Sequence, residues 1–286
     1  MTVPALFISM AATFPPWMPP LFGAVGRVAP AVAARLAAEL LCRPRGRNPP
    51  QPWEHESVLP PPARLILHRG LHALSWGSDG PVVLAQHGWR GRPTQFVRFA
   101  AALVPRGYRL VALDAPGHGV SPGHRLSTRI LADELRAAAD ELGNVHTVIG
   151  HSFGGAAAGI AVDEGLGAKR LVIIGSPTCV SAMMTRLGGE IGLPGPSRAR
   201  LERLFEAHAR RPLRDLDLIA FGPAVASRAL IVHDEDDEVI PVAEARDLER
   251  AWPGARVLYT RGLGHRDLLA EPAVVEAVCA FVDSPG

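Results

Sequence analysis

A Gly-x-Ser-x-Gly segment constrains the fold of this chain more than any other feature of its sequence. Residues 150–154, GHSFG, follow an apolar run and precede a stretch rich in Ala and Gly. This order predicts a buried strand, a sharp turn and then a helix. Glycines two positions before and after the serine fit such a turn, because neighbouring backbone approaches closely there. Ser152 on a strained turn of this kind would hold its hydroxyl clear of the backbone, as a nucleophile requires.

Short apolar runs alternate with helical patterns along most of the chain. Runs of strand character fall at 64–67, 71–76, 81–86, 109–114, 146–151, 170–175, 229–233 and 256–260. Helical patterns fall near 95–105, 128–142, 153–164, 243–251 and 272–282. The first two runs predict a hairpin, and the later alternation predicts a parallel sheet covered on both faces. The predicted fold class is therefore α/β, with a mostly parallel central sheet flanked by helices.

Residues 1–50 depart from this alternation and are expected to form an N-terminal extension. Val28, Val32, Leu36 and Leu40 recur at intervals of four residues, which predicts one amphipathic helix with these side chains on a single apolar face. The Arg- and Pro-rich residues that follow predict a linker or an extended strap, with its arginines in solvent.

Residues 178–226 are a second departure, since they contain no strand pattern. Met183, Met184, Leu187 and Ile191 form one apolar line, and a second helical pattern runs through residues 201–208. We expect a helical cap inserted into a core made of residues 51–177 and 227–286.

Charge and cysteine content exclude several classes of function. The formal net charge is only +2, which does not suggest a nucleic-acid partner. Three scattered cysteines and the absence of metal-binding spacings predict no metal and no other cofactor. No apolar run is long enough for an integral membrane span, and no Lys or Arg precedes Arg27 as a signal peptide would need. The expected protein is cytoplasmic, and a monomer or a homodimer. Alternatives are an interfacial role for the apolar N-terminal segment and docking to another protein through residues 1–45.

A catalytic serine needs a base and an acid that orients the base. When the serine occupies such a strand-to-helix turn, the acid and then the histidine follow it along the chain. His265 comes just after the last predicted strand, behind two glycines that would let the loop approach Ser152. The strand at 229–233 ends in five consecutive acidic residues, among which we predict Asp237 as the acid, with Asp236 as the alternative.

Two backbone N–H groups are expected to stabilise the oxyanion of an acyl-transfer reaction. Phe153 follows the nucleophile directly and should supply one. Trp89, in the loop after the strand at 81–86, should supply the other, and we expect its ring to line the acyl pocket as well.

Together these motifs resemble those of the α/β-hydrolase superfamily, over about residues 63–284. The matching motifs are 87–89 (HGW), 114–121 (DAPGHGVS), 150–154 (GHSFG), 237–241 (DEVIP) and 264–265 (GH). The HGW version is similar to that of small bacterial carboxylesterases. Two features depart from the family pattern: Asp234 stands where a glycine is usual, and the N-terminal extension has no counterpart in the family core.

The resemblance implies a cofactor-independent serine hydrolase whose cap roofs the active site. Trp89, Met183 and Leu187 are then expected to contact the substrate. The expected reaction is cleavage of a carboxylic ester, or a thioester, of a small, largely apolar acyl group through an acyl-enzyme on Ser152. Alternatives are a lyase or a cofactor-free haloperoxidase with the same triad, or a non-catalytic binding protein on the same fold. Family members that use an aspartate nucleophile are excluded by Ser152.

Overall fold

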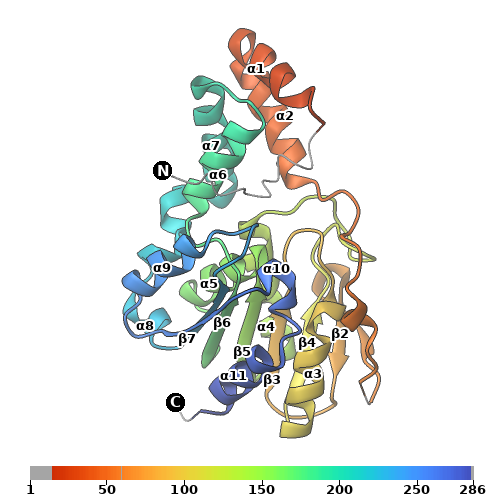
Figure 1. The fold of residues 1–286 in the computed structure, drawn as a ribbon. Coiled ribbons are helices and arrows are strands. Elements are labelled where there is room, and N and C mark those ends of the chain that lie inside the picture. The colour runs from red at the N-terminus through yellow and green to blue at the C-terminus, as the bar shows by residue number, and fades with distance from the viewer. Residues whose placement is uncertain (1–14, 59, 285–286) are drawn as a thin grey trace.

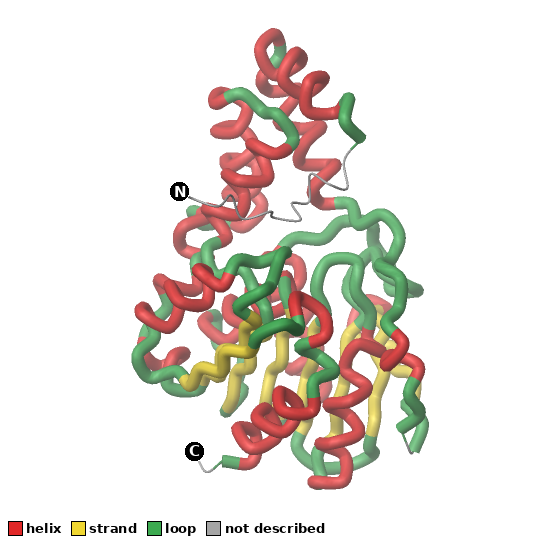
Figure 2. The backbone as a smooth tube through the Cα atoms, viewed as in Figure 1, coloured by secondary structure: helices red, strands yellow, loops and turns green. Residues whose placement is uncertain are grey.

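A computed structural model describes residues 15–58 and 60–284 and contains one eight-stranded sheet (Figures 1 and 2). The strands are β1 (Ala63–Leu67), β2 (Leu71–Trp76), β3 (Val82–Gln86), β4 (Arg109–Leu113), β5 (Val145–His151), β6 (Arg170–Ile174), β7 (Ala229–Asp234) and β8 (Arg256–Thr260). Their order across the sheet is β1-β2-β4-β3-β5-β6-β7-β8. The β1–β2 and β2–β4 pairs are antiparallel and all the others are parallel, which confirms the predicted fold class.

Helices cover both faces of the sheet, as the nearly continuous apolar strands require. One face packs against α4 (Thr128–Leu142) and α5 (Phe153–Asp163), and the other against α3 (Val97–Leu103) and α11 (Pro272–Asp283) (Figure 1). Strand β3 divides its side chains between two apolar cores: Val82 and Leu84 enter the first, and Val83 and Ala85 the second. The remaining core helices are α9 (Val242–Ala251) and α10 (Gly264–Asp267).

A helical lobe stands at one end of the sheet (Figure 2). Between β6 and β7 the chain adds α6 (Val180–Glu190) and α7 (Gly195–Ala209), which belong to this lobe. The short helices η6 (Leu213–Leu216), η7 (Leu218–Ala220) and α8 (Pro223–Ala226) follow, and α8 lies beside β7 and α9 at the sheet (Figure 1). The N-terminal residues add α1 (Met18–Val28) and α2 (Pro30–Cys42), and α2 packs along α7. None of the helices in residues 15–58 and 60–284 combines the length and hydropathy that crossing a bilayer requires.

The prediction of a single N-terminal helix was wrong, because the extension folds into the two-helix hairpin α1–α2. Pro30 cannot continue α1, and it forces Ala29 before it out of the helical region, to φ −135° and ψ 72°. The predicted apolar face was wrong as well. Val28, Val32 and Leu36 are exposed, and α2 instead buries a stripe of small residues, among them Ala33, Ala34 and Ala37.

Candidate active site

Ser152 occupies the turn between β5 and α5 with a strained backbone, at φ 55° and ψ −127°. The flanking glycines explain why this turn tolerates no larger residue. A Cβ on Gly150 would lie 2.4 Å from the Cα of Gly155, and one on Gly154 would lie 2.3 Å from the carbonyl oxygen of Gln86. At residues 150–154, the end of β5, the start of α5 and the end of β3 therefore approach one another closely, and Ser152 lies at the turn between β5 and α5.

His265 lies in α10, just after β8, where the sequence suggested a loop. Its Nδ1 lies 2.8 Å from Oδ2 of Asp237, whose other oxygen accepts hydrogen bonds from the N–H groups of Val239 and Ile240. Burial alone would raise the pKa of Asp237, but the hydrogen bond and the charge of His265 outweigh it and hold that pKa below its ordinary value. Because an ionised carboxylate only accepts, the His265 proton sits on Nδ1 and leaves Nε2 free to act as a base.

Asp236 does not contact His265 through its carboxylate; it accepts a hydrogen bond from the N–H of Gly262 at 3.0 Å. Asp234, the residue that departs from the family pattern, organises the same loop. Its two oxygens accept from the N–H groups of Leu263 and Gly264 and from the Thr260 hydroxyl. Sequence reasoning missed this role, although a carboxylate at the end of a buried strand was a signal for it.

Two buried histidines complete the surroundings of Asp237. The Nε2 of His151 lies 2.9 Å from the carbonyl oxygen of His265, and the two rings are 4.8 Å apart. The Nε2 of His233 lies 2.9 Å from the carbonyl oxygen of Ile240. Burial lowers the pKa of His151 to about 3 and also lowers the pKa of His233. Both rings are therefore neutral near pH 7 and donate to these carbonyls without adding charge beside the triad.

The predicted oxyanion loop leaves β3 and passes directly beside Ser152. A Cβ on Gly88 would lie 2.7 Å from the Cβ of Ser152, so this position excludes any side chain. Trp89 follows, and its ring meets that of Phe153 edge to face, with centroids 6.1 Å apart. Phe153 opens α5, where the first N–H groups of a helix have no acceptor within the helix. Both predicted oxyanion donors thus belong to backbone next to Ser152.

The segment that follows α2, which includes Arg47 and Asn48 and is called the strap below, is bonded to the predicted oxyanion loop. The sequence did not reveal this contact. The N–H of Asn48 donates to the carbonyl oxygen of Arg90 at 2.9 Å, and the Arg92 guanidinium donates to the carbonyl oxygen of Asn48. Arg47, expected in solvent, instead forms an ion pair with the buried Asp114 through Nη2 and Oδ2 at 2.6 Å. Such contacts between residues far apart in sequence leave no local pattern.

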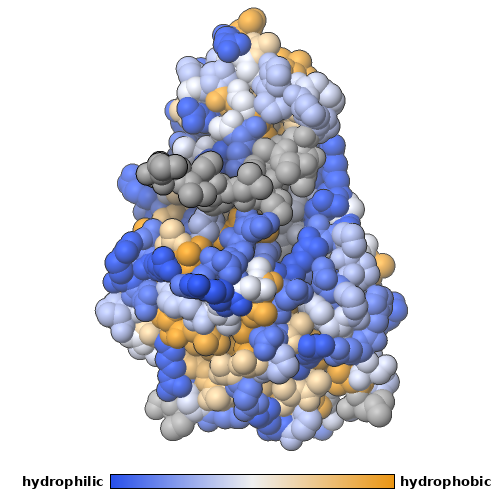
Figure 3. Space-filling view, viewed as in Figure 1, coloured by the Kyte–Doolittle hydropathy of each residue, from blue (hydrophilic) through white to orange (hydrophobic). Residues whose placement is uncertain are grey.

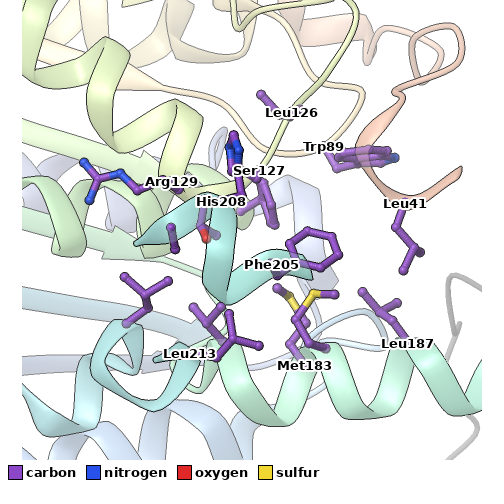
Figure 4. A pocket seen from close by; sticks show the side chains of 16 residues that line it. Leu41, Trp89, Leu126, Ser127, Arg129, Met183, Leu187, Phe205, His208 and Leu213 are labelled. Carbon is purple, nitrogen blue, oxygen red and sulfur yellow. The ribbon is translucent and has the colours of Figure 1, made fainter. Parts of the chain in front are cut away.

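Two adjoining cavities lie beneath the helical lobe. The first, of about 220 Å³, is lined by Ser152, His265, Trp89 and Asn48. The second is almost wholly apolar, and Figure 4 shows Met183, Leu187 and Phe205 around the same space as Trp89 and Leu41. Trp89, Phe153, Met183 and Leu187 line both cavities. The residues predicted to contact substrate therefore join the nucleophile to an apolar side pocket, one wall of which is Leu41 from the N-terminal hairpin.

Comparison with known proteins agrees with this architecture. A family model described as the alpha/beta hydrolase family matches residues 82–278. The chain belongs to the alpha/beta hydrolase family. Among solved alpha/beta hydrolases, a putative lipase from Acinetobacter baumannii superposes with a TM-score of 0.59 at 20% identity, covering 77% of this chain and 90% of the lipase. At that identity the likeness shows the fold alone.

Two relatives match part or most of this chain. A human serine hydrolase-like protein is 37% identical over 94 residues, which cover 31% of this chain and 46% of the human protein. The match thus spans less than half of that relative's length. A pyrethroid hydrolase from Sphingobium wenxiniae is 24% identical over 247 residues, covering 71% of this chain and 88% of the relative.

Proposed function

We propose that this alpha/beta hydrolase cleaves a carboxylic ester, or a thioester, of a small, largely apolar acyl group through an acyl-enzyme on Ser152. The observation that carries the proposal is the 2.8 Å hydrogen bond between His265 and Asp237, in a histidine that lines the same cavity as Ser152. A nucleophile, a base with a free Nε2 and an orienting carboxylate are the parts that acyl transfer needs. The name of the Sphingobium relative, a pyrethroid hydrolase, supports a hydrolytic reaction.

The reaction follows from these roles. His265 Nε2 takes the proton of Ser152 as its Oγ attacks the carbonyl carbon, while Asp237 stabilises the imidazolium that forms. The N–H groups of Trp89 and Phe153 donate to the oxyanion of the tetrahedral intermediate. His265 then protonates the departing alkoxide or thiolate, and a water molecule activated by the same imidazole hydrolyses the acyl-enzyme.

The apolar side pocket supports an apolar acyl group. Its lining includes the polar residues Ser127, Thr128, Arg129 and His208, but most of it is apolar, with Met183, Leu187, Phe205 and Leu41 among its walls. Such a surface favours an apolar chain over a charged one. Esters and thioesters suit the site better than amides, because their leaving groups depart more readily.

The nucleophile can be tested with a fluorophosphonate probe and a series of p-nitrophenyl esters. Wild-type protein should be labelled once and should turn over the esters, whereas Ser152→Ala should lose labelling and about 10⁶-fold in kcat. Thermal unfolding of both proteins controls for folding. An unlabelled, folded wild type would support a non-catalytic binding protein instead, and an active Ser152→Ala variant would remove Ser152 from the mechanism.

A further inference from the structure

The hairpin α1–α2, with Trp17 at its start, exposes several large apolar side chains. Among residues 15–58 and 60–284, ten large hydrophobic side chains are exposed, and half of them belong to this hairpin. Val28 is 88% exposed and Trp17 is 61% exposed. Figure 3 shows hydrophobic residues at the tip of the helical lobe, where Figure 1 places α1. We call these five residues the outer face of the hairpin: Trp17, Leu21, Val28, Val32 and Leu36.

The inner face of the hairpin is made of small residues that allow close packing. A Cβ on Gly26 would lie 2.5 Å from the Cδ of Pro194, and the Ser197 hydroxyl donates to the carbonyl oxygen of Gly26 at 3.2 Å. The buried stripe of α2 is likewise mostly alanine. A surface helix normally buries its largest apolar side chains and exposes polar ones. This hairpin departs from that pattern: Phe22, Val25 and Leu40 pack against the core, but the five large side chains of the outer face stay exposed. Packing among residues 15–58 and 60–284 therefore does not explain the outer face.

The charges around the outer face are of one sign. Residues 15–38 contain no Asp or Glu, and their only charged side chains are the exposed Arg27 and Arg35. The first acidic residue, Glu39, is engaged by Arg43 at 3.0 Å and by Arg125 at 2.6 Å. A second copy of this chain would bring like charges together if it docked face to face. An anionic surface would instead satisfy both arginines.

We propose that the outer face of the hairpin, with Arg27 and Arg35, binds the surface of an anionic lipid bilayer. Apolar side chains on such a helix enter the boundary between headgroups and acyl chains, and tryptophan favours that depth. Guanidinium groups beside them pair with lipid phosphates. The 14 residues that precede the described part of the chain contain no charged side chain, so nothing in their composition opposes contact with lipid.

This surface adjoins the apolar side pocket through a single helix. Leu36 is exposed on α2, and Leu41, little more than one turn further on, lines the pocket. A bilayer bound at the outer face would therefore contact the helix that supplies one wall of this pocket. The use of that contact by apolar esters rests on the proposed function. The binding itself does not depend on catalysis.

The test is sedimentation of the full chain with vesicles of phosphatidylcholine alone and of phosphatidylcholine with phosphatidylglycerol. The protein should sediment with the anionic vesicles, less with neutral ones, and less as salt is added. A Trp17→Ser, Leu21→Ser, Val28→Ser variant should bind at least about tenfold more weakly to both vesicle types. An Arg27→Gln, Arg35→Gln variant should lose about tenfold of its preference for the anionic vesicles.

Matched controls are Ile66→Ser and Val120→Ser, which remove side chains that are 67% and 66% exposed on the core. These variants should bind vesicles like the wild type. All variants should hydrolyse a short, water-soluble ester like the wild type, since none of the changed residues lines the Ser152 cavity. A wild type without esterase activity that still binds anionic vesicles would refute the proposed function and leave this inference standing.

Three results would overturn the inference. The first is a wild type that does not sediment with anionic vesicles, and the second is a triple-serine variant that sediments as well as the wild type. The third is concentration-dependent dimerisation, measured by light scattering, that the triple-serine substitution abolishes, since the outer face would then be an interface between two copies.

Discussion

The catalytic end of the sheet and the helical lobe above it are held together in different ways. At the catalytic end, side chains are fixed by directed hydrogen bonds: both oxygens of Asp237 have partners, and Asp234 accepts from several donors at once. In the lobe, small residues let helices approach closely, and the large side chains are divided between the apolar core, the apolar pocket and solvent. The first arrangement fixes reacting atoms in place, whereas the second shapes which molecules reach them. Substitutions at the catalytic end should therefore change the rate of the chemical step, and those in the lobe should change selectivity.

The sharpest test of this contrast compares two neighbouring carboxylates. Asp237→Asn should lower kcat by about 10⁴-fold, because the amide favours the wrong tautomer of His265. Asp236→Asn should change kcat only a few-fold, since Asp236 holds a loop N–H and not the imidazole. Steady-state kinetics on one p-nitrophenyl ester would measure both. Equal losses would mean that the acid role is shared between the two positions.

The loss of folding stability on Gly→Ala substitution should also differ between the turn at Ser152 and the helical insertion. Gly154→Ala places a methyl group 2.3 Å from the backbone oxygen of Gln86 and should destabilise the fold by about 3 kcal/mol or more. Gly222→Ala, in the helical insertion, meets nothing within 4 Å and has an extended backbone, so its effect should stay within about 0.5 kcal/mol. Denaturant unfolding would compare them. A Gly154→Ala variant as stable as the wild type would show that the close backbone packing at Ser152 can relax.

Selectivity should respond to the lobe. Leu41→Ala enlarges the apolar pocket and should raise kcat/KM for longer acyl esters relative to acetate by about tenfold. Leu36→Ala, on the exposed side of the same helix, should leave this ratio unchanged. A series of p-nitrophenyl esters of increasing chain length provides the ratio. If both variants keep the wild-type profile, the acyl group does not enter this pocket.

The smallest effect should be an acid sensitivity that belongs to the catalytic end. His118 accepts the N–H of Arg90 through Nε2 at 3.0 Å, and burial lowers its pKa to about 4. Because the unfolded chain binds this proton near pH 6.5, the neutral ring stabilises the fold above that pH, and this stability is lost as the pH falls toward 4. His118→Gln should flatten the decline of Tm between pH 6.5 and 4. If His118→Gln leaves this decline of Tm unchanged, other titrating side chains cause the acid sensitivity.

Much of the core was predictable, since its local patterns coincide with its tertiary contacts. Strands buried on both faces are apolar throughout, and the glycines around Ser152 are dictated by contacts within the turn itself. The choice between Asp237 and Asp236 was harder. The two residues are neighbours in sequence, and only the conformation of their turn decides which carboxylate faces His265.

The N-terminal hairpin could not be predicted in the same way. A periodicity argument assigns the largest apolar residues to the buried face. In α2, Val32 and Leu36 are exposed, while a stripe made mostly of alanines is buried. The contacts of the strap could not be predicted from the sequence for a different reason. The ion pair of Arg47 with Asp114 and the bond from Asn48 to Arg90 join residues far apart in sequence, and no local spacing encodes them.

The long separation in sequence between the strap and the loop it contacts affects when the strap docks during folding. Asn48 leaves a translating ribosome long before the acid and the base of the catalytic site, yet it lines the same cavity as both Ser152 and His265. Its docking requires the oxyanion loop, and that loop requires a formed sheet. Closing such long loops is an entropically costly step that comes late in folding. We therefore expect the wall that Asn48 adds to this cavity to be completed only in chains whose sheet has already formed.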